Sequence, residues 1–159
     1  MLEAPRIVQS NAQHTATIHL TIPRDQIQQV MGPAIGEVMA AVTAQGIAIT
    51  GPVFSHHFKM ESATFDFEVG VPVARPISAA GRVQPSGLPA TTVARTVYRG
   101  GYEGLGDAWG EFMTWIAAQG HNAAADLWEC YVAGPESCAD STQWCTEFNR
   151  PLLHGPRKG

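Results

Sequence analysis

Two segments of the chain repeat one another, and this repeat constrains the fold more than any other feature of the sequence. Residues 32–46 read GPAIGEVMAAVTAQG and residues 106–120 read GDAWGEFMTWIAAQG, at a constant offset of 74 (106 − 32). Eight of the fifteen aligned positions are identical, including the Gln-Gly pair that ends each copy. Such self-similarity predicts two copies of one supersecondary unit.

Each copy has the periodicity of an amphipathic helix. In the second copy the apolar residues recur at steps of three and four, and they are Leu105, Trp109, Phe112, Met113 and Ile116. Residues 27–42 repeat the pattern in the first copy. Both helices are expected to end at Gln-Gly, because glycine adopts the left-handed cap conformation at little steric cost. Matched internal glycines, Gly32, Gly36, Gly106 and Gly110, predict close packing of the helix backbone on a sheet or a common ancestor of the two copies.

Strand-like segments flank both predicted helices. Residues 15–22 alternate and are rich in β-branched side chains, and residues 90–98 hold the same place before the second helix. The strands expected after the helices are residues 53–58 and 63–73 in the first copy and residues 127–132 and 143–153 in the second. This order predicts tandem duplicated β-α-β-β units of an SHS2-like α+β fold.

The two units are expected to be related by a pseudo-twofold axis, with an antiparallel sheet, both helices on one side and a central cleft. We predict a single domain over residues 1–159. It comprises a first repeat over about 5–74, a linker over 75–88, a second repeat over about 89–153 and a tail over 154–159. The proline and glycine content of 75–88 carries the linker assignment.

The composition excludes several classes of protein. Of the 159 residues, 45% are hydrophobic and 15% charged, which describes a folded globular protein rather than a disordered one. A net charge of −4 and scattered basic residues argue against direct binding of nucleic acid. No segment has the length of a membrane span and no signal pattern opens the chain, so a cytoplasmic location away from membranes is expected.

No metal or cofactor is predicted. The three cysteines form no C-x-x-C pair, and Cys130 and Cys145 stand in apolar strand-like runs as core residues. His56 and His57 are adjacent on a strand and therefore point to opposite faces, which does not suit a shared metal ion. The sequence contains no Walker, Rossmann or G-x-S-x-G pattern.

Glu129 is the most informative single residue. It lies between Trp128 and Cys130 in an apolar strand-forming run, and alternation places it on one face with Tyr131. Burial raises the pKa of a carboxyl group unless a cation or hydrogen-bond donors compensate. Such a group can pair with a cationic aromatic ligand, or it can act as a general acid or base. A solvent-facing strand carboxylate is the alternative interpretation.

The repeat offset identifies the counterparts of this strand. Subtracting 74 from Trp128, Glu129 and Tyr131 gives Phe54, Ser55 and His57. If the cleft lies on the pseudo-twofold axis, His57 faces Tyr131 across it. An imidazole there favours acid–base chemistry or a polar or anionic ligand over a purely cation-binding site. A hydrogen-bonded strand histidine without function is the alternative.

Several aromatic residues are candidates for the walls of the cleft. Tyr102 follows the glycine pair at 100–101 and leads into the second helix, where it is a predicted groove wall. Trp128, Trp144 and Phe54 lie on predicted strands and offer flat stacking surfaces to a ligand. The helix aromatics Trp109, Phe112 and Trp115 are assigned to the core.

The motifs and their order resemble those of the GyrI-like family, the bacterial transcription-activator effector-binding domains. The resemblance runs from about Pro5 to Leu153. Its carriers are GPVF at 51–54, FEVGVPV at 67–73, RGGYEGL at 99–105, WIAAQG at 115–120 and WECYVAGP at 128–135.

The resemblance implies a groove that binds hydrophobic, aromatic or cationic small molecules, with the family's groove glutamate at Glu129 and the following aromatic residue at Tyr131. Family members are often fused to a DNA-binding domain, for which this chain has no room because its first strand begins near residue 6. We therefore expect a multidrug-binding or sequestering protein.

Two alternatives come with the same resemblance. The first is hydrolysis of cyclopropane-containing DNA-alkylating natural products, with Glu129 as the base and Tyr131 or His57 assisting. The second is an interaction protein that modulates gyrase. The sequence also leaves open a homodimer through an edge strand.

Overall fold

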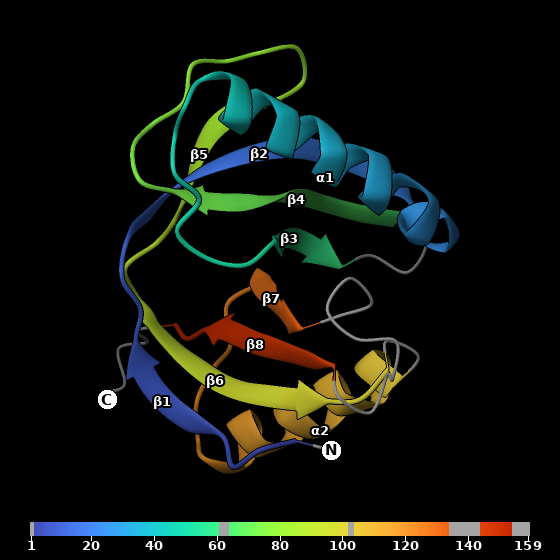
Figure 1. The fold of residues 1–159 in the computed structure, drawn as a ribbon. Coiled ribbons are helices and arrows are strands. Elements are labelled where there is room, and N and C mark those ends of the chain that lie inside the picture. The colour runs from blue at the N-terminus through green and yellow to red at the C-terminus, as the bar shows by residue number, and fades with distance from the viewer. Residues whose placement is uncertain (1, 61–63, 102–103, 134–143, 154–159) are drawn as a thin grey trace. The chain divides into compact units, whose positions relative to one another are not determined.

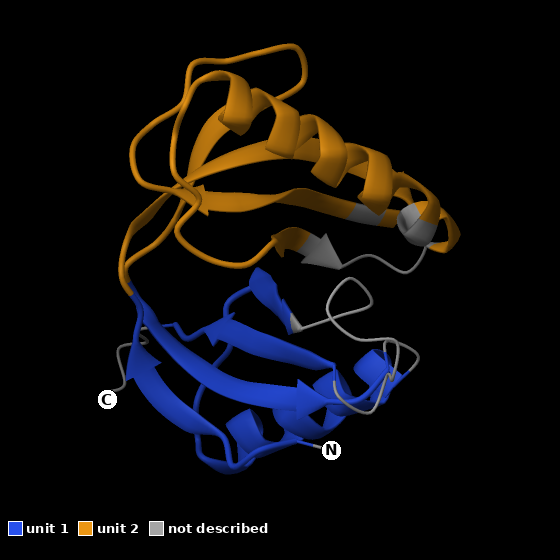
Figure 2. Cartoon of the chain, viewed as in Figure 1, with its two compact units in different colours: residues 1–10, 91–159 blue, residues 11–90 orange. Residues whose placement is uncertain are grey.

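The computed structural model describes the chain except residues 1, 61–63, 102–103, 134–143 and 154–159. Its helices and strands (Figure 1) divide into two units (Figure 2). Unit 1 is formed by Met1–Ser10 together with Thr91–Gly159, and unit 2 by Asn11–Ala90. Each unit combines one long helix with antiparallel strands, so the predicted α+β class is confirmed.

Unit 2 contains the first copy of the repeat. In chain order its elements are β2 (Gln13–Pro23), the single-turn helix η1 (Arg24–Gln26), α1 (Ile27–Ala44), β3 (Phe54–Met60), β4 (Thr64–Val73) and β5 (Gln84–Leu88). The strands pair antiparallel in the order β3-β4-β2-β5. Alternate residues of β2 and β4 pack with α1 in a core that includes Ile18, Val38, Val42, Phe67 and Val69.

Unit 1 contains the second copy. Its elements are β1 (Arg6–Gln9), β6 (Thr92–Arg99), α2 (Leu105–Ala118), β7 (Leu127–Ala133) and β8 (Cys145–Pro151), and the strands pair antiparallel in the order β1-β6-β8-β7. Its core is more aromatic and contains Tyr98, Phe112 and Phe148 beside smaller residues. Within the described ranges of the chain, no helix is long and apolar enough to cross a membrane.

Both units have the same strand order, but their outermost strands come from unexpected places in the chain. In unit 2 the outer strand beside β2 is β5, which lies inside the segment 75–88 that the sequence assigns to a linker. In unit 1 the same place beside β6 is taken by β1, from the other end of the chain. Pro85 and Gly87 are linker signals, yet an edge strand tolerates both because one of its sides needs no ladder hydrogen bonds.

The predicted glycine caps are confirmed. Gly46 follows α1 with φ +66° and Gly120 follows α2 with φ +81°, both in the left-handed region. A residue with a Cβ atom is strained in that conformation, so the Gln-Gly pair ends each helix at matching positions.

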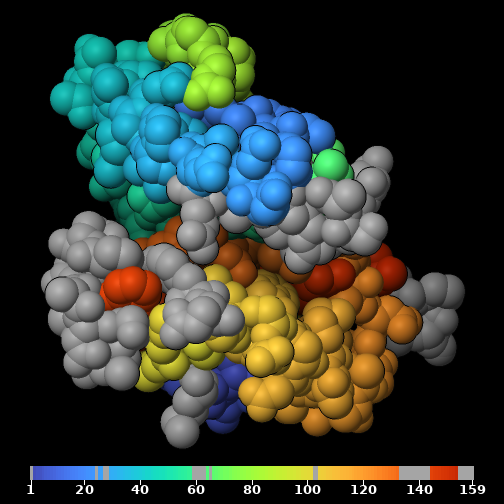
Figure 3. All heavy atoms as spheres, turned by 90° about the vertical axis from the view of Figure 1, so that its right-hand side faces the viewer, coloured from blue at the N-terminus to red at the C-terminus, as the bar shows by residue number. Residues whose placement is uncertain are grey.

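The expectation that the glycines inside the helices pack closely on a sheet is wrong. Apart from its chain neighbours and the nearby backbone of its own helix, a Cβ atom at Gly32, Gly36, Gly106 or Gly110 would meet no atom of the described residues within 4 Å. All four residues are exposed. The space-filling view shows α1 in light blue and α2 in yellow to orange at the surface (Figure 3). Packing therefore does not require these glycines, and the common ancestor is the interpretation left.

One strand glycine is required by packing. A Cβ atom at Gly70 in β4 would lie 1.9 Å from the carbonyl oxygen of Ala16 on the neighbouring strand β2. That distance is far inside van der Waals contact, so only glycine allows the two strands to approach as they do.

Candidate functional site

Strand β7 places Glu129 on the side of the unit 1 sheet that faces α2. Glu129 lies opposite Phe148 of β8, and Phe148 is fully buried in the core beneath α2. Alternation along the strand sends Tyr131 to the same side and Trp128 and Cys130 to the other. The faces predicted from the sequence are those of the structure.

Two neutral donors hold the Glu129 carboxylate. The Tyr131 hydroxyl donates a hydrogen bond to Oε1 at 2.9 Å, and the indole N–H of Trp109 on α2 donates to Oε2 at 2.5 Å. Glu129 is only 8% exposed, so these bonds replace most of the water that a surface carboxylate would contact. Each carboxylate oxygen therefore has a fixed aromatic donor.

The environment of Glu129 favours its neutral form. Burial raises the pKa of Glu129 because desolvation disfavours the charged carboxylate. The hydrogen bonds from Trp109 and Tyr131 act in the opposite direction and offset part of this shift. Among the ion pairs between described residues, none includes Glu129. A buried carboxylate without a countercharge can take up a proton or accept a cationic partner.

Trp109 is a site residue that the sequence reasoning assigned to the core. It does pack there, since its ring stacks on Phe148 with centroids 4.3 Å apart and planes 6° apart. Its indole N–H nevertheless reaches across to the strand carboxylate. The N–H of a tryptophan packed against a core usually finds a hydrogen-bond acceptor. The counterpart of the partly buried Trp109 in the first copy is Ile35 (109 − 74). The change from an aliphatic side chain in the first copy to a hydrogen-bond donor in the second is the sequence signal that indicates a polar role for Trp109.

The equivalent position in unit 2 carries a different polar pair. Ser55 and His57 of β3 lie opposite Val69 and Phe67 of β4, and therefore on the side that faces α1. The Ser55 hydroxyl and Nε2 of His57 are 3.0 Å apart, and both residues are buried. The His57 ring stacks on Phe67 with centroids 4.9 Å apart. The register thus confirms the repeat alignment of Ser55 with Glu129 and of His57 with Tyr131.

The other predicted site residues belong to several elements, and Trp128 points to the opposite side of the β7 sheet from Glu129. Trp128 and Phe54 are buried on the sheet faces that point away from α2 and α1, respectively. Trp144 is half-buried just before β8, where its carbonyl accepts a hydrogen bond from the Gly100 N–H. Tyr102 lies outside the described residues. That His57 and Tyr131 share one cleft stays a prediction.

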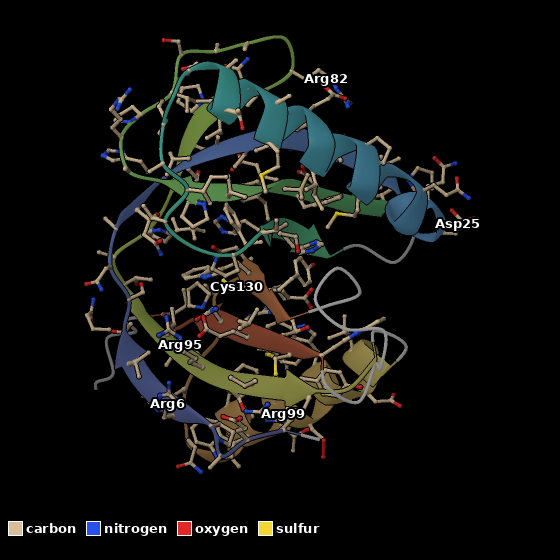
Figure 4. All side chains as sticks on the ribbon, viewed as in Figure 1. Arg6, Asp25, Arg82, Arg95, Arg99 and Cys130 are labelled. Carbon is tan, nitrogen blue, oxygen red and sulfur yellow. The ribbon has the colours of Figure 1, made fainter. Side chains whose placement is uncertain are left out.

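The side of the unit 1 sheet that points away from α2 carries a separate polar network. Arg95 of β6 donates to Oδ1 of Asn149 at 2.7 Å, and Asn149 donates to Glu147 at 3.1 Å. Arg95 and Cys130 of β7 are labelled in Figure 4. Burial raises the pKa of Cys130 to about 12, so its thiol stays protonated and unreactive at neutral pH. The described residues hold no group of three His, Cys, Asp or Glu side chains placed for a metal ion.

Comparisons with known proteins give a family and a set of similar folds. The family model of the GyrI-like small molecule binding domain matches residues 3–148. No curated protein matches the chain. Several solved structures do match, each at an identity that shows the fold alone.

EcmrR provides two of these structures. The crystal structure of its C-terminal domain is 20% identical, with 94% of this chain and 97% of that chain covered and a TM-score of 0.83. The cryo-EM structure of EcmrR with DNA is 21% identical with a TM-score of 0.83, and 94% of this chain covers only 57% of that longer chain. This chain therefore spans little more than half the length of EcmrR.

Two further structures are more distant. SAV2435 bound to tetraphenylphosphonium is 12% identical, with 96% of this chain and 95% of that chain covered and a TM-score of 0.64. A hydrolase from Listeria innocua is 9% identical, with 94% and 91% covered and a TM-score of 0.61.

Proposed function

The chain belongs to the GyrI-like small-molecule-binding family, and from this premise we propose that it binds hydrophobic aromatic cations with Glu129 as the polar anchor. The observation that carries the proposal is the buried Glu129 carboxylate, held by two neutral donors and by no cationic side chain among the described residues. A ligand cation supplies the charge that this site lacks.

The energetics favour a cation over a neutral ligand. Hydrogen bonds from neutral donors replace only part of the hydration free energy that a carboxylate loses on burial. The attraction between the carboxylate and a ligand cation is therefore stronger here than at the protein surface. The aromatic rings of Trp109 and Tyr131 flank the carboxylate, and a cation over such a ring gains about 0.5–2 kcal/mol. An aromatic ligand also buries apolar area against the same rings.

A protein of similar fold is consistent with this ligand class. SAV2435 has been solved with tetraphenylphosphonium, an aromatic cation that offers no hydrogen-bond donor. At 12% identity this does not transfer the ligand to the present chain, but it identifies a suitable first probe.

Titration with tetraphenylphosphonium tests the proposal. Glu129→Gln removes the charge but keeps the size of the side chain and an acceptor for the Trp109 N–H. Glu111→Gln is the matched control, because Glu111 lies on α2 and is exposed to solvent. We expect calorimetry to show binding that is about tenfold or more weaker in Glu129→Gln, a loss of about 1.4 kcal/mol. The control is expected to bind like the unmodified protein.

Two results would contradict the proposal. One is equal affinity for the cation in the unmodified protein and in Glu129→Gln. The other is the absence of saturable binding across a panel of aromatic cations of different size.

A second candidate function is hydrolysis of a strained electrophile, favoured by the raised pKa of Glu129 and the Tyr131 hydroxyl 2.9 Å from it. A carboxylate tuned toward neutral pH is a suitable general base. In this reaction Glu129 takes a proton from water while the water oxygen bonds to a cyclopropane carbon. The broken C–C bond gives its electron pair to a conjugated carbonyl, whose oxygen receives the Tyr131 proton, and the tyrosinate then recovers a proton from Glu129.

Mass spectrometry separates this reaction from binding alone. The protein is incubated with a cyclopropane-bearing alkylator, and the product is expected to gain the mass of one water. Turnover should vanish in Glu129→Gln and persist in Glu111→Gln. Saturable binding with no product in the unmodified protein excludes hydrolysis and leaves the binding function in place.

A further inference from the structure

Thr146 carries a buried hydroxyl group to which the described residues offer no hydrogen bond. The residue is 0% exposed, and its Oγ1 has no hydrogen-bond partner among the described residues. Buried hydroxyls are nearly always bonded, so a buried one without a partner calls for an explanation such as a missing ligand or water. Its position on β8 indicates which of the two applies.

Thr146 lies on the α2-facing side of the sheet, beside the Glu129 site. In the register it stands directly opposite Tyr131 of β7 and Tyr98 of β6. Directly opposed side chains on antiparallel strands have Cβ atoms about 5 Å apart, and diagonal neighbours such as Glu129 lie at about 7–8 Å. A substituted aromatic ring spans such a separation.

The neighbouring phenols are already engaged. The Tyr131 hydroxyl donates to Glu129, and the Tyr98 hydroxyl donates to the carbonyl of Gly101 at 2.9 Å. Neither proton is directed to Thr146, so the group remains available to an incoming molecule.

The first copy of the repeat has a purely apolar side chain at the position that corresponds to Thr146. The offset of 79 (147 − 68) that aligns Glu147 with Glu68 pairs Thr146 with Phe67. Phe67 is fully buried and stacks on His57, so unit 2 fills the place with a ring. Unit 1 has instead a small side chain with a hydroxyl next to Tyr131.

We propose that Thr146 is a specificity-determining residue whose hydroxyl hydrogen-bonds a polar atom of the bound ligand. The site then selects aromatic cations that carry a hydroxyl, carbonyl or amine group over those that carry none. This inference rests on the proposed binding function at Glu129 and names the ligand class more narrowly.

Two isosteric probes test the selection. They are triphenylphosphonium cations whose fourth ring carries either a 4-hydroxymethyl or a 4-ethyl group, so that only the hydroxyl differs. The measured quantity is the ratio of their dissociation constants. For the unmodified protein we expect the hydroxymethyl probe to bind about fivefold tighter than the ethyl probe, as one net hydrogen bond predicts.

Three variants locate the source of the ratio. Thr146→Val removes the hydroxyl at constant shape and is expected to bring the ratio close to one, and Thr146→Ser is expected to restore it. Thr96→Val is the matched control. Thr96 lies on β6 on the α2-facing side of the sheet, as Thr146 does on β8, but its hydroxyl donates to the Glu3 carbonyl at 2.6 Å. The ratio should be unaffected by Thr96→Val.

Melting temperatures without ligand give an independent readout. Thr146→Val should melt no lower than the unmodified protein, since the Thr146 hydroxyl has no hydrogen-bond partner in the described part of the chain, whereas Thr96→Val should melt lower. A lower melting temperature in Thr146→Val, or the same ratio in Thr146→Val as in the unmodified protein, overturns the inference. If both probes bind and depend on Glu129 but not on Thr146, this inference alone fails; if neither binds, the proposed function fails with it.

Discussion

The hydroxyl of Tyr131 donates a hydrogen bond of 2.9 Å to Oε1 of Glu129, two residues earlier on the same strand. Because side chains on a strand alternate, residues two apart share a face and can pair without any tertiary contact. Ser55 and His57 form the corresponding pair in unit 2, 3.0 Å apart. Each unit thus carries a local polar pair beneath its helix, but only the pair of unit 1 contains a carboxyl group.

Tyr131→Phe is expected to raise the pKa of Glu129 further. The hydrogen bond from Tyr131 stabilises the charged carboxylate, so its removal leaves desolvation less opposed. Carbon NMR of the Glu129 carboxyl group during a pH titration measures the shift. Tyr98→Phe is the control, because that hydroxyl bonds the Gly101 carbonyl and not Glu129. An unchanged or lower pKa in Tyr131→Phe would contradict the assignment of this bond.

Trp109→Phe is expected to destabilise the protein by about 1–3 kcal/mol at pH 7, because it leaves one oxygen of a buried carboxylate without a donor. Trp115→Phe is the control on the same helix, since Trp115 packs beside Phe112 in the same core. Urea unfolding measures both variants. The larger loss should belong to Trp109→Phe and should shrink toward pH 4; equal losses would show that only ring volume matters.

Glu129→Gln is expected to stabilise the ligand-free protein at neutral pH. The folded pKa of Glu129 is raised above the unfolded value, so the folded state binds more protons between the two values and stability falls as pH rises through that interval. The neutral amide removes this loss. Unfolding measured from pH 4 to pH 8 should therefore show a gain that is largest at high pH and that disappears below the unfolded pKa. A gain that is the same at every pH would argue against titration of Glu129.

Gly70→Ala is expected to destabilise unit 2 by more than about 3 kcal/mol, as a backbone clash in a sheet does. The added methyl group would meet the Ala16 carbonyl at 1.9 Å. Gly36→Ala provides the contrast, since no described residue outside the nearby turns of its own helix lies within 4 Å of the Cβ position, and alanine favours a helix by about 1 kcal/mol. Thermal melting should move in opposite directions in the two variants, and a similar change in both would refute the contact at Gly70.

The helices and the longer strands were predictable because their signals are local. The repeat fixed both helices to within a few residues, and alternation fixed which side of β7 carries Glu129. These features depend only on periods of 3.6 and 2 along the chain. The repeat offset of 74 paired Ser55 with Glu129 as equivalent positions, and the strand register agrees with that pairing.

The outer strands and the Trp109 contact were not predictable in the same way. β1 and β5 have four and five residues, and so short a strand carries too few residues for its sequence to predict which strand it pairs with. The helical glycines predicted close packing, but none of the described residues outside their own helix approaches their Cβ positions within 4 Å. Inheritance from a common ancestor produces the same glycine pattern. Trp109 followed the apolar stripe of α2, and its second role depends on a strand twenty residues later.

The place of β1 has a consequence for how the chain is made. All of unit 2 lies between β1 and the rest of unit 1 in the chain, and Arg6 pairs with Arg95, 89 positions later (95 − 6). During synthesis unit 2 is complete before β6 leaves the ribosome, and domains generally fold as units in the order of their emergence. β1 therefore has no β6 to pair with until unit 2 has been synthesised. Unit 1 therefore completes its sheet last, and a nascent chain stopped before β8 has all of unit 2 but lacks the strand that pairs with the Glu129 strand β7.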